Sequence, residues 1–197
     1  EVSRLIAGKL PVTLTLAGLS LLLIIIFSIP IGILWGGTKS RFIDGALNVL
    51  SQFTMSVPSF FLGIIIIYLF GLIMRWFTPG GYISYKEDFR GYIRYMLFPA
   101  ITVALPKAAM TAKFLRNSII TQLKSDYVRT AYSKGARRMR VLFVHVLRNA
   151  MIPVVTFIGV IAAEIAAGSI VVEQVFGLPG IGRLLVSSIS TRDYPVV

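Results

Sequence analysis

The sequence predicts an all-α protein that crosses a membrane several times as a helix bundle. Of its 197 residues, 56% are hydrophobic and 14% are charged, and the mean hydropathy is +0.81, whereas globular domains carry about 25% charged residues. Four apolar segments meet or approach the roughly 20 residues that a helix needs to cross the hydrocarbon core. They cover about residues 11–35, 49–74, 96–115 and 150–172. The chain begins at Glu1 without a signal-peptide pattern, so we expect an internal part of a longer membrane protein.

The first two segments are strong span candidates. Residues 11–35 contain the apolar run "LSLLLIIIFSIPIGIL". Residues 49–74 contain "SVPSF" near their start. Proline has no backbone N–H and disfavours helical geometry in the residue before it. We therefore expect a kink at this break rather than a serine nucleophile.

The third and fourth segments each carry an ionisable residue. Residues 96–115 contain two prolines and Lys107, so we expect this span to be surrounded by protein rather than by lipid. Residues 150–172 contain Glu164 among small alanines. Ionisable groups at membrane depth are costly and normally face a bundle interior or a water-filled path. Lys107 and Glu164 are therefore candidate path residues, and pairing with each other or with a neighbouring subunit is the structural alternative.

Basic residues predict the orientation of the chain. The connections after the first and third spans hold eleven Lys and Arg residues, nine of them between Lys113 and Arg148, against eight on the other side. Since Lys and Arg accumulate in cytoplasmic loops, we expect residues 125–148 to be cytoplasmic. The net charge of +12 also occurs in nucleic-acid binders, but beyond Tyr127 and Tyr132 the basic segment lacks the interleaved aromatic residues that stack on bases. No nucleic-acid partner is expected.

The stretch "SDYVRTAYSKGARRMRVLFVHVLRNA" predicts an elbow made of two helices joined at a glycine. Ser125 can cap the first helix, and Gly135 suits the left-handed residue that commonly ends one. The first helix carries one narrow apolar face, made by Tyr127, Val128, Ala131 and Tyr132. One interpretation of this segment is a lever that docks on a partner protein. The alternative is an ordinary basic loop that lies near anionic lipid.

The elbow also resembles the EAA loop of ABC importer permeases, in the form found in the oligopeptide/dipeptide/nickel family. Gly135 matches the glycine of that loop, Ala131 stands four residues before it, and Arg129 replaces its glutamate. Four more blocks are similar to the family in the same order, namely "LPVTLTLAGLSLLL", "IPIGIL", "SVPSFFLGIIII" and "VVEQVFGLPGIGRLLVSSISTRDYPVV". The resemblance covers nearly the whole chain.

The resemblance implies a type I ABC importer permease with about six spans per subunit, of which four are present here. Residues 1–197 would form a single transmembrane permease domain whose first and last spans are missing. The elbow at about residues 125–148 would be a coupling helix in a cleft of a cytoplasmic ATPase, with a docking face of Tyr127, Val128, Arg129, Ala131, Tyr132 and Gly135. The stretch "GLPGIGRL" would be an extracytoplasmic gate turn, with Gly177, Pro179, Gly180 and Gly182.

The expected chemistry is transport rather than catalysis. The chain has no phosphate-binding G-x-x-x-x-G-K-[ST] loop, and the single histidine, His145, cannot build a catalytic triad or a usual zinc site. No catalytic residue, metal site or cofactor is expected in this chain, and ATP and Mg²⁺ would be used by partner subunits. The resemblance implies four partners: a sister permease in a heterodimer, two ATPase subunits and an extracytoplasmic solute-binding protein.

The predicted function is the permease subunit of an ATP-driven importer in the cell (inner) membrane, which carries di- or oligopeptides by alternating access. A polar path suits a peptide, whose backbone and termini need hydrogen bonds. A permease of the same family for nickel or another small solute is the nearest alternative. A membrane anchor that recruits a cytoplasmic enzyme through the basic elbow is the alternative from another class.

Overall fold

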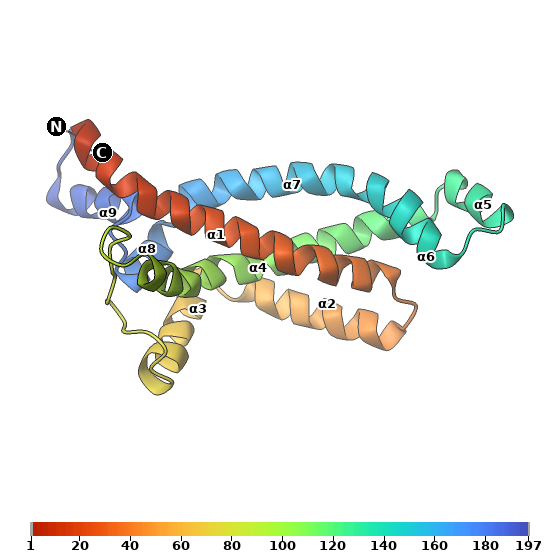
Figure 1. Ribbon diagram of the computed structural model, residues 1–197, viewed down its shortest axis with the longest axis horizontal. Helices are drawn as coiled ribbons and strands as arrows, with labels where there is room; N and C mark the ends of the chain where they lie inside the picture. Colours follow the sequence, from red (N-terminus) through yellow and green to blue (C-terminus); the bar gives the residue numbers. More distant parts are fainter. Residues whose placement is uncertain (1, 197) are drawn as a thin grey trace. The chain divides into compact units, whose positions relative to one another are not determined.

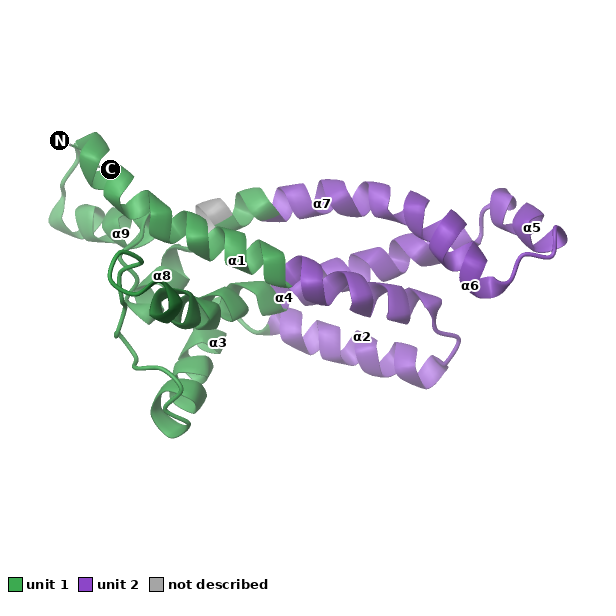
Figure 2. Ribbon diagram, viewed as in Figure 1, with its two compact units in different colours: residues 1–23, 57–105, 162–197 green, residues 24–56, 106–161 purple. Residues whose placement is uncertain are grey.

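The computed structural model describes residues 2–196, without the side chains of residues 166–168. The described residues form helices, with no strand among them, and a long connection over residues 74–88 precedes the helix Phe89–Leu123 (Figure 1). The predicted all-α class is confirmed. Two compact units share the chain (Figure 2): unit 1 comprises residues 1–23, 57–105 and 162–197, and unit 2 comprises residues 24–56 and 106–161.

Unit 1 has a core of aromatic rings. It contains the first part of α1 (Val2–Gly37), α3 (Ser59–Ile66), the π-helical segment η1 (Ile67–Ile73), the first part of α4 (Phe89–Leu123), the end of α7 (Leu147–Gly168), α8 (Ile170–Phe176) and α9 (Ile181–Thr191). The ring of Phe77 stacks on that of Phe98, with centroids 4.1 Å apart. The hydroxyl of Tyr95 donates a 2.8 Å hydrogen bond to the carbonyl of Phe176. The hydrogen bond joins α4 to α8, and the stacked rings join the connection before α4 to α4 itself.

Unit 2 has an aliphatic core. It contains the second part of α1, α2 (Arg41–Ser56), the second part of α4, α5 (Asp126–Ser133), α6 (Arg138–Arg140), the π-helical segment η2 (Val141–Val146) and most of α7. The core cluster of unit 2 comprises Leu115, Ile119, Val128, Val141, Leu142, Val146, Ala150 and Val154. A Cβ at Gly32 would lie 2.8 Å from the side chain of Leu115, and one at Gly36 would lie 2.9 Å from Ile119. These two glycines therefore let α1 approach α4 closely, as small residues do between membrane helices.

Three helical stretches are long and apolar enough to cross a membrane: α1, α4 and the run Arg138–Ile165. They correspond to the first, third and fourth predicted spans. In α4, 56% of the most apolar window is buried, against 28% in α1 and 22% in the run Arg138–Ile165. The expectation that protein surrounds the third span is therefore supported.

The second predicted span is not one straight helix. α2 and the run Ser59–Ile73, which comprises α3 and η1, are together apolar enough to cross a membrane, but the chain bends by 94° at the break around Pro58. The predicted kink is confirmed, and a continuous helix over residues 49–74 is wrong, because Pro58 has extended backbone (ψ 140°) and cannot donate to a preceding helical turn.

The fourth predicted span ends earlier than expected. α7 stops at Gly168 rather than at residue 172, and α8 and α9 follow as a second bent pair with an angle of 89°. The described residues thus hold three long apolar helices, or up to five spans if each bent pair counts as one. The predicted number of four lies between these values.

Candidate functional site

The elbow has the helix–glycine–helix form that the sequence predicts. α5 ends in a Schellman motif, in which the N–H of Gly135 donates to the carbonyl of Tyr132 (2.9 Å) and the N–H of Ala136 donates to that of Ala131 (3.1 Å). Gly135 has a φ of +78°, a conformation that residues with a side chain rarely adopt. Ser125 occupies the N-cap position of α5, but its side chain makes no capping hydrogen bond, so that detail of the prediction is wrong.

One face of α5 packs on the chain itself. Val128 is 1% exposed and belongs to the core cluster of unit 2, and Tyr127 and Ala131 pack against this cluster. The hydroxyl of Tyr127 also donates a 2.8 Å hydrogen bond to Gln122 Oε1. These three members of the predicted docking face therefore hold α5 to the rest of unit 2. A partner that binds the elbow in this conformation does not reach the side chain of Val128.

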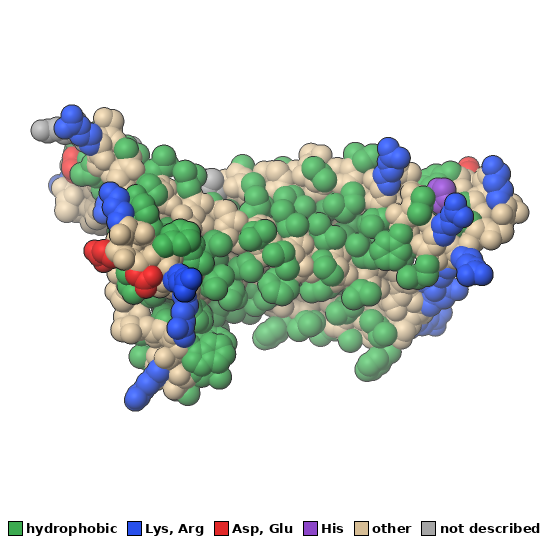
Figure 3. Space-filling view, viewed as in Figure 1, with side chains coloured by type: hydrophobic (Ala, Val, Ile, Leu, Met, Phe, Trp, Pro, Cys, Tyr) green, Lys and Arg blue, Asp and Glu red, His purple; other side chains and the backbone are tan. Residues whose placement is uncertain are grey.

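The remaining surface of α5 is exposed and carries basic side chains. The side chain of Arg129 is 80% exposed, Tyr132 is 44% exposed, and a Cβ at Gly135 would meet open space. Figure 3 shows Lys and Arg side chains gathered around α5 and α6. We call the exposed set Arg129, Tyr132, Lys134 and Gly135 the outer face of the elbow.

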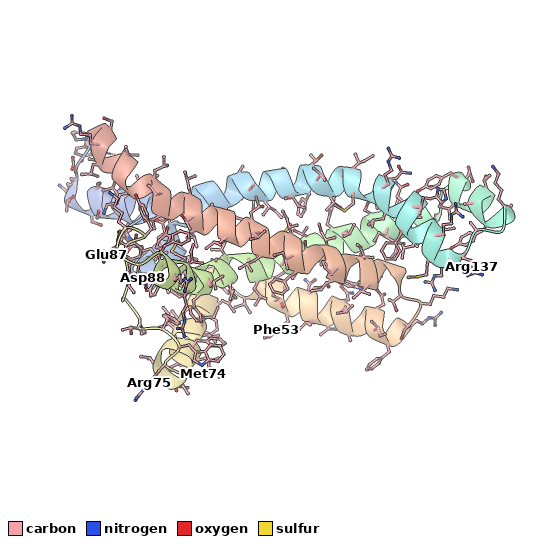
Figure 4. All side chains as sticks on the ribbon, in the orientation of Figure 1. Phe53, Met74, Arg75, Glu87, Asp88 and Arg137 are labelled. Carbon is pink, nitrogen blue, oxygen red and sulfur yellow. The ribbon has the colours of Figure 1, made fainter. Side chains whose placement is uncertain are left out.

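The two arginines that follow the elbow's turn differ in their contacts. Arg138 donates from Nη2 to the carbonyl of Gly37, the last residue of α1, and so satisfies an acceptor that the helix end leaves unpaired. The side chain of Arg137, labelled in Figure 4, is exposed and makes no hydrogen bond or ion pair with the described residues. Neutralising Arg137 therefore removes charge alone, whereas neutralising Arg138 also removes a contact with α1.

The second candidate site is the corner between α8 and α9 in unit 1. α8 ends in another Schellman motif: Gly177 has a φ of +69°, and the N–H of Leu178 donates a 2.8 Å hydrogen bond to the carbonyl of Glu173. Arg183 reinforces the turn by donating from Nη1 to the carbonyl of Gly177 (2.7 Å). The predicted gate residues Gly177, Pro179, Gly180 and Gly182 are thus brought together in one tight corner.

Two of these glycines are needed for close packing rather than for a left-handed backbone. Gly180 is the N-cap of α9 with extended backbone, and a Cβ there would lie 2.5 Å from Glu173 Oε1. A Cβ at Gly182 would lie 2.6 Å from the Cα of Ile170. Both positions therefore leave space only for hydrogen, which allows the start of α9 to press against α8.

A fully buried carboxylate fills the corner. Glu173 Oε1 accepts hydrogen bonds from the hydroxyls of Thr13 (2.8 Å) and Ser169 (3.2 Å), and Oε2 accepts one from the N–H of Arg183 (3.1 Å). Thr13 Oγ1 accepts in turn from the N–H of Ile181 (2.9 Å). Side chains from α1 and α8 thus satisfy the first-turn donors of α9, whose positive end favours the buried carboxylate. Glu173 was not among the predicted site residues.

A second polar cluster, in unit 2, was also not predicted. Asp44 Oδ1 accepts hydrogen bonds from Trp35 Nε1 (2.7 Å), Arg116 Nε (3.0 Å) and Arg116 Nη2 (2.6 Å). The guanidinium of Arg116 also lies 5.5 Å from the centroid of the Trp35 ring, within the range of a cation–π interaction. This cluster fixes the start of α2 to α1 and α4.

The predicted path residues lie in different units. Lys107 is partly buried on α4 in unit 2, and Glu164 is exposed on α7 in unit 1. Their path role stays a prediction. Within residues 2–196, no group of three or more His, Cys, Asp or Glu side chains is placed to hold a metal ion.

Comparison with known proteins gives consistent matches. Residues 28–197 match the family model described as "binding-protein-dependent transport system inner membrane component". The chain is 37% identical over 198 residues to the oligopeptide transport system permease protein AppB of Bacillus subtilis. It is 36% identical over 196 residues to a probable peptide ABC transporter permease protein of Sinorhizobium fredii, and 39% identical over 200 residues to a putative peptide transport system permease protein of Brucella abortus. These matches cover all of this chain but only 62–63% of each relative.

Proposed function

The chain belongs to the family of binding-protein-dependent transport system inner membrane components, and we propose that it is a permease subunit of an ATP-driven peptide importer. The observation that carries the proposal is the family match over residues 28–197, together with relatives whose names describe peptide permeases. The chain forms part of the translocation path and works by alternating access. ATP hydrolysis takes place in other subunits.

Peptides are the favoured cargo. The relatives named above are described as peptide or oligopeptide permeases, and none of those names describes a nickel permease. A membrane anchor for a cytoplasmic enzyme is disfavoured by family membership, because the family is defined by transport. The nearest alternative is a permease for nickel or another small solute. An uptake assay with labelled peptide and with the small solute distinguishes the two.

The elbow is the coupling element of this proposal. Its inner face, with Tyr127, Val128 and Ala131, packs on the core cluster of unit 2, so a force applied to α5 passes to α4 and α7. Its outer face, with Arg129, Tyr132 and Gly135, is accessible to an ATPase cleft. The six residues of the predicted docking face therefore divide into three that anchor the lever and three that contact the partner.

The complete importer contains more than this chain. We expect a sister permease in a heterodimer, two cytoplasmic ATPase subunits that use ATP and Mg²⁺, and an extracytoplasmic solute-binding protein. The corner between α8 and α9 is the extracytoplasmic gate turn. The buried hydrogen bonds of Glu173 hold the corner in one defined conformation. A gate turn that moves as a rigid unit needs such a conformation.

Glu164 and Lys107 line the path in this proposal. Replacing Glu164 with glutamine keeps the size of the side chain and removes its charge. Glu164→Gln is expected to impair peptide uptake in reconstituted vesicles while the purified complex keeps its normal subunit composition. Loss of the assembled complex would instead assign Glu164 to pairing between subunits.

The orientation is tested by single-cysteine labelling, because the chain has no cysteine of its own. Ser133 on α5 and Glu87 before α4 are both exposed (Glu87 is labelled in Figure 4). Ser133→Cys is expected to react with an impermeant maleimide only from the cytoplasmic side, and Glu87→Cys only from the outside. The reverse pattern would overturn both the orientation and the coupling role of the elbow.

A further inference from the structure

The amphipathic helix α2 turns its polar side toward its own chain and its apolar side outward. Asp44 accepts from Arg116, Gln52 Oε1 accepts a 3.1 Å hydrogen bond from Lys113 Nζ, and Ser51 is buried. Large apolar side chains point the other way: Phe42 is 85% exposed, Val49 is 72% exposed, and Phe53, labelled in Figure 4, is 69% exposed. The surroundings of α2 are therefore apolar, which is the reverse of a helix that faces water.

The apolar side of α2 carries a shallow, open groove of about 650 Å³ between its large side chains. Gly45 and Ala46 leave room in it because their side chains are small, and a Cβ at Gly45 would meet no other atom within 4 Å. Apart from Arg41 at one end, the residues that line this apolar groove are Phe42, Gly45, Ala46, Val49, Leu50 and Phe53.

A second pocket, of about 420 Å³, lies at the start of α2 and is rich in cations. Its basic residues are Lys39, Arg41, Arg116 and Arg138, and its acidic residue is Asp44. Arg116 is held by Asp44, and Arg138 is held by the carbonyl of Gly37. The side chains of Lys39 and Arg41 make no hydrogen bond or ion pair with the described residues. The basic pocket thus keeps two positive charges that the chain does not neutralise.

We propose that the basic pocket and the apolar groove together form a binding site for an anionic phospholipid. Arg41 lines both, so a phosphate bound by Lys39 and Arg41 places the attached acyl chain at the entrance of the groove. The charge of the pocket complements a phosphate, and the groove complements a hydrocarbon chain. A free phosphate lacks the hydrocarbon chain, and the headgroup of a zwitterionic lipid adds a positive charge that the two cations disfavour.

The location of the site along the chain fits a lipid headgroup. The pocket follows the last turn of the apolar helix α1 and contains Trp35, and tryptophan is enriched at membrane–water interfaces. Basic residues next to the cytoplasmic end of a span attract anionic lipids. Tyr132 of α5 lines the same pocket, so a bound headgroup would also contact the elbow. The inference does not depend on the transport function.

The test measures lipid binding to the full-length protein, purified together with the subunits that it assembles with. Native mass spectrometry compares retention of phosphatidylglycerol and phosphatidylcholine with the same acyl chains. We expect the wild type to retain phosphatidylglycerol preferentially. Each lost cation weakens an anionic lipid contact about fivefold, so Lys39→Gln with Arg41→Gln is expected to lower the phosphatidylglycerol affinity roughly 25-fold.

Two further variants make the test specific. Lys124→Gln with Arg137→Gln removes the same charge at exposed positions outside both pockets, and wild-type retention is expected. Ala46→Trp fills the apolar groove without changing charge and is expected to lower phosphatidylglycerol retention.

Three results would overturn the proposal. The first is equal retention of the two lipids by the wild type. The second is equal loss in both double-charge variants, which would show non-specific attraction. The third is an Ala46→Trp protein that loses a subunit but keeps its phosphatidylglycerol, which would assign the groove to protein contact.

Discussion

Gly135→Val is expected to uncouple the importer: ATP hydrolysis stimulated by the loaded binding protein and peptide uptake should both fall, although the chain still inserts and assembles. Gly135 has a φ of +78° and closes the Schellman motif that ends α5. A β-branched residue strongly disfavours this conformation, and such strain costs about 1–3 kcal/mol. That cost corresponds to roughly a 5- to 150-fold loss in the population of the folded elbow. ATPase and uptake assays on the reconstituted complex measure the effect.

Gly135→Asn is the matched control at the same position. Asparagine is among the few residues with a side chain that adopt the left-handed conformation, and a Cβ at this position meets no neighbouring atom. This variant should keep most of the coupling. Arg137→Gln, which removes an exposed charge without a contact, should resemble the wild type. If Arg137→Gln abolished coupling while Gly135→Val did not, the elbow would be an electrostatic anchor rather than a lever.

Glu173→Leu is expected to destabilise the corner between α8 and α9. The substitution removes the acceptor for the hydroxyls of Thr13 and Ser169, which are 7% and 2% exposed. Each buried donor left without a partner costs about 1–3 kcal/mol, so the two together cost about 2–6 kcal/mol before the lost bond to the N–H of Arg183 is counted. The thermal unfolding midpoint of the purified complex should fall, and protease cleavage within residues 177–183 should increase.

Glu87→Leu is the control for this prediction. Glu87 is an exposed acid in the connection before α4, and its side chain makes no hydrogen bond with the described residues (Figure 4). The same chemical change there should leave the unfolding midpoint close to that of the wild type. Equal midpoints for Glu173→Leu and the wild type would contradict the role of Glu173 in holding α9.

Features that depend on a few neighbouring residues were predictable from the sequence. Gly135 and Gly177 end short helices because a left-handed residue is needed there. Pro58 interrupts the helix because its ring removes the backbone N–H donor. The long apolar runs in α1, α4 and α7 depend on composition alone. Each of these signals lies within one turn or one segment of the chain.

Features that depend on distant partners were not predictable in the same way. The apolar face of α5 was expected to meet another protein, but Val128 is buried in the core cluster of its own chain. Asp44 and its partner Arg116 are 72 residues apart in the sequence, and Glu173 and its partner Thr13 are 160 residues apart. The sequence does place Glu173 shortly before Gly180 and Gly182. That spacing indicates a contact with Thr13 only once α9 is known to fold back against α8.

The most direct test of the account is uptake of a labelled oligopeptide by vesicles that contain the complete complex. ATP is placed on the side of the elbow, and the solute-binding protein is placed on the other side. The account predicts that peptide accumulates only when both are present, and that the Gly135→Val complex accumulates little. A complex that assembles and hydrolyses ATP but accumulates nickel or another small solute instead of peptide would contradict the proposed cargo. A complex that accumulates no solute under these conditions would contradict the proposed transport function.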